Sequence, residues 1–422
     1  MSRIRVGIIG AGGRGIMSFG QLMTTEFADD VELVAMADTN RERAKAGLKF
    51  LGVSAEVHED YHDMVARKDV DAVVVTTPDY LHEEPCVAAF KQKKHVLVDK
   101  PLAITGKGCL RVIEAAKRAN ALLYMGFNLR HDAVLKELKS LVVQNTFGKI
   151  YSIQAIEHYD GGRTYMARWN RLKKYSGGLF IHKGSHDFDI INWMMGEARP
   201  ERVSCFGNVF TLNPKGLPFK PRPGVKPGPT CTACAYLKKC KDALPAIPQR
   251  RPAGAAGAVS MMYDEKASNL DGYHRDLCIY LSDKDTHDQG IGIVEYDNGA
   301  TASHSEYFVT SLTNRRYLIE GTLGHGEGDL HANRVEVRPR WSQEIITHDI
   351  KRPVGGHGGA DNHMCAEFIQ CLKRGLRPSA SGIDGAWSVA IGQACELSRA
   401  EKRMVRINEV LDVKSSLLKL KR

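Results

Sequence analysis

The stretch Arg5-Val-Gly-Ile-Ile-Gly-Ala-Gly-Gly-Arg-Gly15 decides the fold of this 422-residue chain. It places a short apolar strand, Val6 to Ile9, directly before a turn of closely spaced glycines, and helical sequence follows from Ile16. In this setting a Gly-x-Gly-x-x-Gly turn lets backbone N–H groups approach a pyrophosphate at the start of a helix, so the stretch predicts a dinucleotide-binding fold. The cofactor contacts predicted at the turn are Gly10, Gly12, Gly13, Arg14 and Gly15.

The end of the next predicted strand indicates which dinucleotide binds. The run from Val31 ends at Asp38, at a spacing from the glycines that suits a carboxylate bound to both ribose hydroxyls of NAD. Such a carboxylate repels the extra phosphate of NADP, although Arg41 and Arg43 lie close enough to leave NADP possible. Asp38 has a second interpretation, as the N-cap of a helix over residues 40–50.

Two further strand–helix units end in polar residues that a parallel sheet brings to one edge. Continuous apolar strands end at residues 76–78 and 99–101, and a last strand over 122–130 closes the predicted domain. Ligands bind at this carboxyl edge of parallel sheets, where Lys100 is either a solvated residue or a hydrogen-bond donor to a reacting oxygen. The edge residues expected at the cofactor or substrate are Thr77, Pro78, His82, Asp99, Lys100, Asn128 and Arg130.

A second stretch carries the candidate chemistry. Residues 176–189, Ser-Gly-Gly-Leu-Phe-Ile-His-Lys-Gly-Ser-His-Asp-Phe-Asp, are predicted to begin a helix that continues to Gly196. His182, His186 and Asp189 stand at i, i+4 and i+7, so a helix places them on one face. This face indicates proton transfer, and a solvated polar face and a His-x3-His metal pair are the alternatives.

Two other segments contribute candidate substrate contacts. An aromatic and basic segment over residues 165–175 precedes the histidines, and its Trp169 either stacks on a sugar ring or packs in a surface loop. A glycine-rich segment over residues 355–361 opens a later helix, and its His357 lies either at the rim of the pocket or simply in a loop.

The length and composition set the broad class of the protein. A chain of 422 residues exceeds what one core usually serves, so two domains are expected. We expect a cytoplasmic protein with no membrane segment, because no apolar run is long enough to span a bilayer and Arg3-Ile4-Arg5 leads straight into a strand rather than a signal peptide. The net charge of +10 is not accompanied by basic motifs interleaved with aromatics, so no nucleic-acid partner is expected.

The segment 221–252 is rich in Pro, Gly and basic residues and is predicted to be an inserted loop. It contains Cys231-x2-Cys234-x5-Cys240, and Cys278 follows in the next segment. In a cytoplasmic chain this spacing indicates a metal, with the thiolates holding structural zinc or forming part of an iron–sulfur ligand set. The alternative is a group of reduced cysteines with no metal.

The features together resemble a known family. They are the glycine turn, Asp38, Thr77-Pro78 with His82, Asp99-Lys100-Pro101 and the Gly-Ser-His-x-x-Asp of the second stretch, and they resemble the Gfo/Idh/MocA family of glucose-fructose oxidoreductases and inositol dehydrogenases. The resemblance covers nearly the whole chain. It implies an α/β protein with an N-terminal Rossmann domain, residues 1–127, and a C-terminal α/β domain, residues 128–422, built on a large, mostly antiparallel open sheet that serves dimers or tetramers.

The resemblance also implies roles for single residues. It assigns the reacting oxygen to Lys100, proton exchange to His186, and orientation of the helix or of the histidine to Asp189. The chain departs from the family pattern at His182, where most members have Asp, so His182 either replaces His186 in proton exchange or shares it. The expected substrate contacts are Lys100, Arg130, Trp169, His182, Lys183, His186 and His357.

Three functions follow from this pattern. The first is an NAD-dependent dehydrogenase or reductase that acts on CH–OH groups of sugars, glycosides or inositol-like polyols. The second is a glycoside-cleaving enzyme that uses NAD transiently, oxidising a ring carbon so that elimination releases the aglycone with no net NADH. The third is a non-catalytic NAD-binding sensor, which only the departure at His182 favours.

Overall fold

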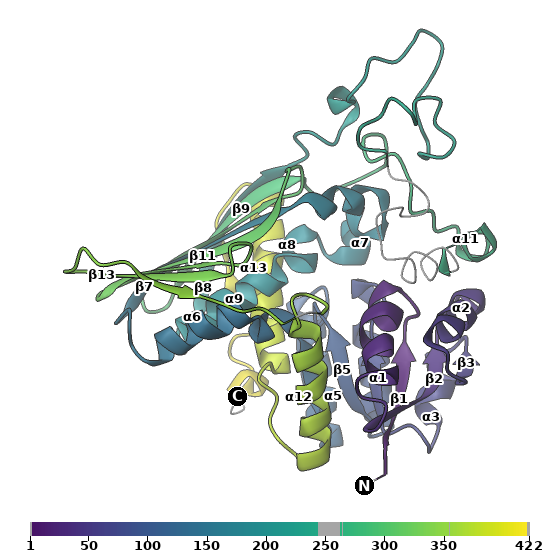
Figure 1. The fold of residues 1–422 in the computed structure, drawn as a ribbon, viewed down its shortest axis with the longest axis horizontal. Coiled ribbons are helices and arrows are strands. Elements are labelled where there is room, and N and C mark those ends of the chain that lie inside the picture. Colours follow the sequence, from purple (N-terminus) through teal and green to yellow (C-terminus); the bar gives the residue numbers. More distant parts are fainter. Residues whose placement is uncertain (1, 244–261, 264, 354, 420–422) are drawn as a thin grey trace.

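The computed structural model describes residues 2–243, 262–263, 265–353 and 355–419, so the predicted loop is described only as far as residue 243. Two sheets dominate the molecule and lie one above the other in Figure 1. None of the helices in the described part combines the length and the apolar character needed to cross a membrane.

The first sheet is parallel and has the strand order β3-β2-β1-β4-β5-β6, which is the doubly wound order expected from the glycine turn. Residues 6–9 of β1 and all of β4, at its centre, are buried and carry no polar side chain, as in other parallel sheets. The strands are β1 (Ile4–Ile9), β2 (Val31–Ala37), β3 (Glu56–His58), β4 (Ala72–Val75), β5 (His95–Asp99) and β6 (Leu123–Gly126). The helices between them are α1 (Gln21–Thr24), α2 (Arg41–Leu51), α3 (Tyr61–Ala66), α4 (Glu83–Lys91) and α5 (Gly106–Ala119).

The second sheet has nine strands in the order β14-β13-β12-β11-β7-β10-β9-β8-β15. Only the β10–β7 pair is parallel, which confirms the expected mostly antiparallel sheet. The strands are β7 (Ile150–Tyr159), β8 (Pro200–Asn208), β9 (Gln289–Tyr296), β10 (Thr301–Tyr307), β11 (Thr313–Gly321), β12 (Gly324–Asp329), β13 (Arg334–Pro339), β14 (Ile346–Asp349) and β15 (Val405–Arg406).

Helices cover one face of the second sheet (Figure 1), where α6 (Ala133–Val143), α9 (Ser185–Met195) and α13 (Gly382–Glu401) pack against it. Ser381 and Asp384 form a capping box that begins α13. The outer face of the sheet exposes apolar side chains, whereas the free face of an antiparallel sheet is usually polar. They include Tyr151, Phe206, Ile291 and Ile293.

One late helix belongs to the core of the first sheet. α12 (Ala360–Arg374) contributes Met364, Cys365 and Phe368 to the same buried apolar cluster as Val6 of β1. The ring of Phe368 packs edge-on against Tyr124 of β6, with ring centroids 5.6 Å apart. Residues beyond 128 therefore complete the core that the N-terminal strands begin.

Candidate active site

The glycines of the turn are of two kinds: at some the neighbouring backbone leaves no room for a side chain, and at others the space above the backbone is open. A side-chain carbon at Gly15 would lie 2.1 Å from the carbonyl oxygen of Gly10, and Gly10 itself has a φ of +101°. At Gly13 such a carbon would meet no atom within 4 Å, and at Gly12 only the hydroxyl of Tyr263, at 3.7 Å. The turn thus fits a pyrophosphate, with room above its middle glycines and a helix starting behind them.

Asp38 lies just past the end of β2 and organises this turn. Its carboxylate accepts hydrogen bonds from the backbone N–H groups of Ala11, at 2.8 Å, and Asn40, at 2.7 Å. The N-cap of α2 is Asn40, whose side chain accepts from the N–H of Arg43, so the alternative N-cap role of Asp38 was wrong. A carboxylate has about four acceptor positions, so Asp38 retains capacity for ribose hydroxyls.

Arg14 differs from expectation because it does not extend toward a phosphate. Its guanidinium binds both oxygens of Asp99, at 2.9 and 3.2 Å, and also contacts Asp361 at 3.2 Å. Asp361 in turn accepts from Asn128 Nδ2, at 2.8 Å, and lies 2.8 Å from His357 Nδ1. These residues form a polar junction between β5, β6 and α12. Four of them were predicted to contact cofactor or substrate, namely Arg14, Asp99, Asn128 and His357, and the structure pairs each of the four with another side chain of the junction.

The loops that follow β4 and β5 are tied together by His82. Its Nδ1 lies 2.6 Å from the carbonyl oxygen of Pro101 and its Nε2 lies 2.9 Å from that of Thr77, so both ring nitrogens face backbone oxygens. The Thr77 hydroxyl donates to the carbonyl of Leu81, and Pro78 begins the short turn between them. His82 therefore positions this edge of the sheet instead of offering a nitrogen to a cofactor.

The predicted helix after Gly178 is two helices, α8 (Leu179–His182) and α9, separated by Lys183 and Gly184. A side chain at Gly184 would lie 2.7 Å from the carbonyl oxygen of Phe180, so the backbone here packs too closely to continue as one ideal helix. The break places His182 and His186 on different helices. The charge of Lys100 nevertheless lowers the pKa of both imidazoles, as the second largest cause after burial. Lys100, His182 and His186 therefore belong to one site.

A carboxylate that the sequence reasoning missed binds His182. Its Nδ1 lies 2.7 Å from Oδ2 of Asp79, and its Nε2 lies 3.0 Å from Nδ2 of the buried Asn170. Lys100 Nζ donates to the backbone carbonyl of the same histidine at 2.5 Å. The signal for Asp79 was its place directly after Thr77-Pro78, at the edge where ligands bind; no comparable signal marked Asn170.

Burial sets the protonation of this cluster. It raises the pKa of Asp79 to about 7, although Lys100 opposes the shift. It lowers the pKa of Lys100 to about 8, with Asp79 opposing that shift. Burial and then Lys100 hold the pKa of His182 and of His186 well below 6.5. Near pH 7 the site therefore contains a protonated amine beside two neutral imidazoles.

His186 differs from His182 in having no hydrogen-bond partner among the residues that the structure describes. Neither of its ring nitrogens makes a hydrogen bond to a described residue; Nδ1 is buried, and the ring lies 6.0 Å from that of Phe127. Both ring nitrogens of His182 are engaged. His186 is therefore the imidazole that can accept a proton from a bound molecule without first breaking a contact.

Aromatic side chains surround His182. The rings of Tyr165 and Trp169 meet it edge-on, with centroids 5.1 and 5.4 Å away. The predicted contact Lys183 is buried, with Nζ 3.1 Å from Glu157 Oε1 and 3.8 Å from the ring centroid of Tyr159. Trp169 thus lies at the site, whereas the ammonium of Lys183 points into an internal ion pair.

Glu157, Asp187 and His304 have side-chain ligand atoms within 4.8 Å of one another. Arg315 Nη2 lies 2.5 Å from Glu157, its Nε lies 3.2 Å from Asp187, and Lys183 adds a second cation. Two cations already neutralise the two carboxylates, so this group is a buried ion-pair cluster and leaves no charge for a metal ion.

Arg130 also differs from expectation, because its guanidinium does not face a substrate. It is 4% exposed, binds both oxygens of Asp189 at 2.8 and 2.6 Å, and lies 3.3 Å from Asp384. Asp189 therefore anchors α9 to the residues after β6.

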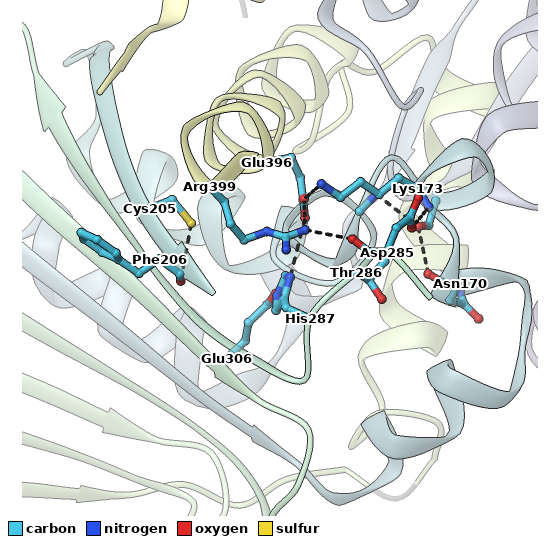
Figure 2. Close-up of polar contacts among 12 residues, drawn as sticks. Asn170, Lys173, Cys205, Phe206, Asp285, Thr286, His287, Glu306, Glu396 and Arg399 are labelled. Atoms are coloured by element: carbon cyan, nitrogen blue, oxygen red, sulfur yellow. Dashed lines mark hydrogen bonds and ion pairs between the residues drawn. The ribbon is translucent and has the colours of Figure 1, made fainter. Parts of the chain in front are cut away.

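A buried network supports the segment in front of the histidines (Figure 2). Lys173, at the start of α7 (Lys173–Ser176), pairs with Glu396 of α13 at 2.9 Å, and Arg399 joins the same carboxylate at 2.7 Å. His287 bonds Glu306 of β10 at 2.5 Å, on the sheet side of the network. The network fixes α7, and through it α8, between the sheet and α13.

The four predicted metal ligands lie around one small cavity of about 20 Å³, whose walls include Cys231, Cys234, Cys240 and Cys278. Cys234 Sγ accepts backbone N–H groups from Gly228, at 3.3 Å, and Tyr236, at 3.4 Å. Within the described residues, however, no three of these thiols lie within 4.8 Å of one another. The four cysteines therefore line one cavity, but their sulfur atoms are farther apart than the ligands of one bound metal ion would be.

Comparison with known proteins gives matches over most of the chain. Residues 4–127 match the model of the GFO_IDH_MocA oxidoreductase family with its NAD-binding Rossmann fold, and residues 139–238 and 253–407 match the C-terminal alpha/beta domain of the same family. The putative oxidoreductase YteT of Bacillus subtilis (strain 168) is 27% identical, over 96% of this chain and 98% of its own length.

Two further matches are similar over nearly their full length. Myo-inositol 2-dehydrogenase of Thermotoga maritima is 27% identical, over 97% of this chain and all of its own. A solved levoglucosan dehydrogenase in complex with NADH superposes with a TM-score of 0.72, over 96% of this chain and 99% of its own, at 18% identity. The last comparison shows a shared fold.

Proposed function

Because the chain belongs to the GFO_IDH_MocA family of NAD-binding oxidoreductases, we propose that it is an NAD-dependent dehydrogenase of a sugar, glycoside or inositol-like polyol. The observation that carries the proposal is the meeting of Lys100, from the edge of the first sheet, with His182 and the unpartnered His186 from the helices beside the second. An ammonium can donate a hydrogen bond to the reacting oxygen and a neutral imidazole can accept its proton, and oxidation of a hydroxyl by a bound nicotinamide uses both functions.

In this proposal bound NAD supplies the hydride acceptor, held by the backbone at Gly12 and Gly13 and by Asp38. Lys100 donates a hydrogen bond to the reacting oxygen and stabilises the negative charge that develops on it. His186, whose ring nitrogens have no hydrogen-bond partner among the described residues, accepts the hydroxyl proton. His182, fixed by Asp79, holds the Lys100 ammonium through its carbonyl oxygen and so positions it.

The substrate class rests on two kinds of support. The rings of Tyr165 and Trp169 form an aromatic wall beside His182, which suits the apolar face of a sugar or cyclitol. Relatives of similar length are named for myo-inositol and levoglucosan, which are ring polyols or anhydrosugars. We assign NAD binding to residues 1–127 and most substrate contacts to residues 128–422.

The test is anaerobic incubation of the protein with NAD and a panel of inositols, sugars and glycosides, following NADH absorbance together with aglycone release. We expect net NADH with one substrate class. Lys100→Ala should abolish most of this turnover, whereas Lys107→Ala, an exposed lysine on α5, should not change it. Undiminished turnover in Lys100→Ala would overturn the assignment.

A second candidate is the glycoside-cleaving enzyme that uses NAD transiently. The Asp79–His182 pair favours it, because elimination after ring oxidation needs a second proton-transfer group besides His186. Aglycone release without net NADH would support this candidate over the dehydrogenase. Tight NAD binding without either signal would support the sensor instead.

We also propose that copies of the chain associate through the outer face of the second sheet. Phe206 and Ile291 are paired across β8 and β9, and both point outward, 71% and 36% exposed. Neighbouring exposed apolar side chains extend the patch, as at many subunit interfaces. Light scattering behind gel filtration should give a dimer or tetramer, and Phe206→Asp should shift it toward monomer.

For the cysteine cluster we propose a structural zinc held by Cys231, Cys234, Cys240 and Cys278. Support comes from their convergence on one cavity and from the N–H groups directed at Cys234, which stabilise a thiolate. Binding would draw the four sulfurs together. A coloured protein would instead indicate an iron–sulfur cluster. A purified protein without metal would support the alternative of four reduced cysteines.

A further inference from the structure

A helix that follows the inserted loop in sequence lies next to the predicted adenosine site on the first sheet. This helix, α11 (Glu265–Asp271), packs on the start of α2 (Figure 1). Asn40 Nδ2 donates both to the carbonyl of Ala267, at 2.8 Å, and to Asp271 Oδ2, at 3.0 Å. Lys266 pairs with Glu42 at 2.7 Å. The helix is thus docked on the loop that follows β2.

The docked helix brings a second carboxylate to Arg43. Arg43 Nη2 donates to Asp271 Oδ2 at 2.6 Å, while its Nη1 lies 3.8 Å from Asp38 Oδ1. The N–H of Tyr273 donates to the other oxygen of Asp271 at 3.0 Å. Burial raises the pKa of Asp271, but hydrogen bonds from Asn40, Tyr273 and Arg43 outweigh burial and lower it, so the carboxylate is charged near pH 7.

An arginine shortly after the acidic residue of β2 is the group that would receive the 2′-phosphate of NADP. Here Asp38 and Asp271 lie on either side of Arg43, so its guanidinium is already neutralised and one negative charge remains over the ribose site. We infer that Asp271 is a cofactor-selectivity residue: with Asp38 it excludes NADP in favour of NAD. The inference rests on the proposed use of NAD and names the feature that selects it.

Direct binding tests the inference without a substrate. The full-length protein is titrated with NADH and with NADPH, following nucleotide fluorescence. Asp271→Asn keeps the oxygen that Asn40 and Arg43 bind but removes the charge. We expect NADPH to bind to Asp271→Asn about tenfold to hundredfold more tightly than to the wild type, because its 2′-phosphate carries about two negative charges and the variant has one carboxylate fewer to repel them. NADH affinity should change less than about threefold, because NADH lacks the 2′-phosphate.

Lys266→Ala is the matched control, because it removes another contact between α11 and α2 and leaves Arg43 and Asp271 in place. We expect it to keep the wild-type preference for NADH. An equal loss of both nucleotides in Asp271→Asn would reduce Asp271 to a docking role and overturn the inference, as would unchanged NADPH affinity. A wild-type protein that binds neither nucleotide would overturn the proposed function and this inference with it.

Discussion

Asp79→Asn tests how the buried cluster controls the lysine at the proposed centre of the reaction. The substitution preserves size but removes the charge that keeps Lys100 protonated against burial. Two unit charges at close range interact by about 1 kcal/mol in water and by about 4 kcal/mol at an effective dielectric constant of about 20, which is roughly one to three pH units. The pKa of Lys100 starts near about 8, so the variant should lose the protonated amine around neutral pH.

The assay is the pH dependence of kcat/KM in the wild type and in Asp79→Asn. We expect the alkaline limb of the wild type near pH 8 to move down by at least one pH unit in the variant, with NADH affinity unchanged. Asp69→Asn, at an exposed carboxylate before β4, is the control and should leave the limb in place. A variant that loses rate at every pH while keeping its alkaline limb would refute the coupling between Asp79 and Lys100.

Three further predictions concern the two histidines, the buried Glu306 and the cysteine cluster. His186→Gln should lower kcat by about 10²–10⁴-fold with NADH binding intact, and His182→Gln by less; the reverse order would make His182 the proton acceptor. The pKa of His304 is raised, because its negatively charged neighbours outweigh burial, so its contribution to stability is complete below pH 6.5 and is lost as pH rises through the folded pKa. Glu306→Gln should therefore lower the free energy of unfolding in urea by about 3–5 kcal/mol near pH 6 and flatten its fall toward pH 9, and an unchanged slope would contradict this reasoning. Purified protein should contain one zinc per chain by elemental analysis, Cys234→Ser should lose it and melt at a lower temperature, and a metal-free wild type would disprove the site.

The first sheet could be predicted from the glycine turn, because the strand, the turn and the helix that a dinucleotide requires follow one another directly in the sequence. Strand, turn and helix succeed one another within a few residues, so no distant part of the chain is needed to interpret Gly10 or Gly15. The family resemblance correctly extended this to the nine-stranded sheet, whose pairing order is not local. The family assignment itself is confirmed by the matches to both halves of the chain.

The contacts of individual side chains were less predictable because most partners are far apart in sequence. Helix spacing predicted that His182, His186 and Asp189 share one helix face. The structure instead breaks the helix after His182, and Asp189 forms an ion pair with Arg130. Asp79 lies over one hundred positions before the histidine it binds. Arg14 looked like a phosphate ligand only because its two carboxylate partners come from other elements.

The place of α12 in the first core has a consequence for how the chain must fold. During synthesis the six parallel strands leave the ribosome long before Met364 and Phe368, which cover their apolar surface. Until those residues arrive, the early strands expose part of that surface, and a nascent chain in this state is prone to aggregation. A fragment ending at residue 127 would remain permanently in that condition, so the dinucleotide half is a folding unit only in the company of a helix made more than two hundred residues later.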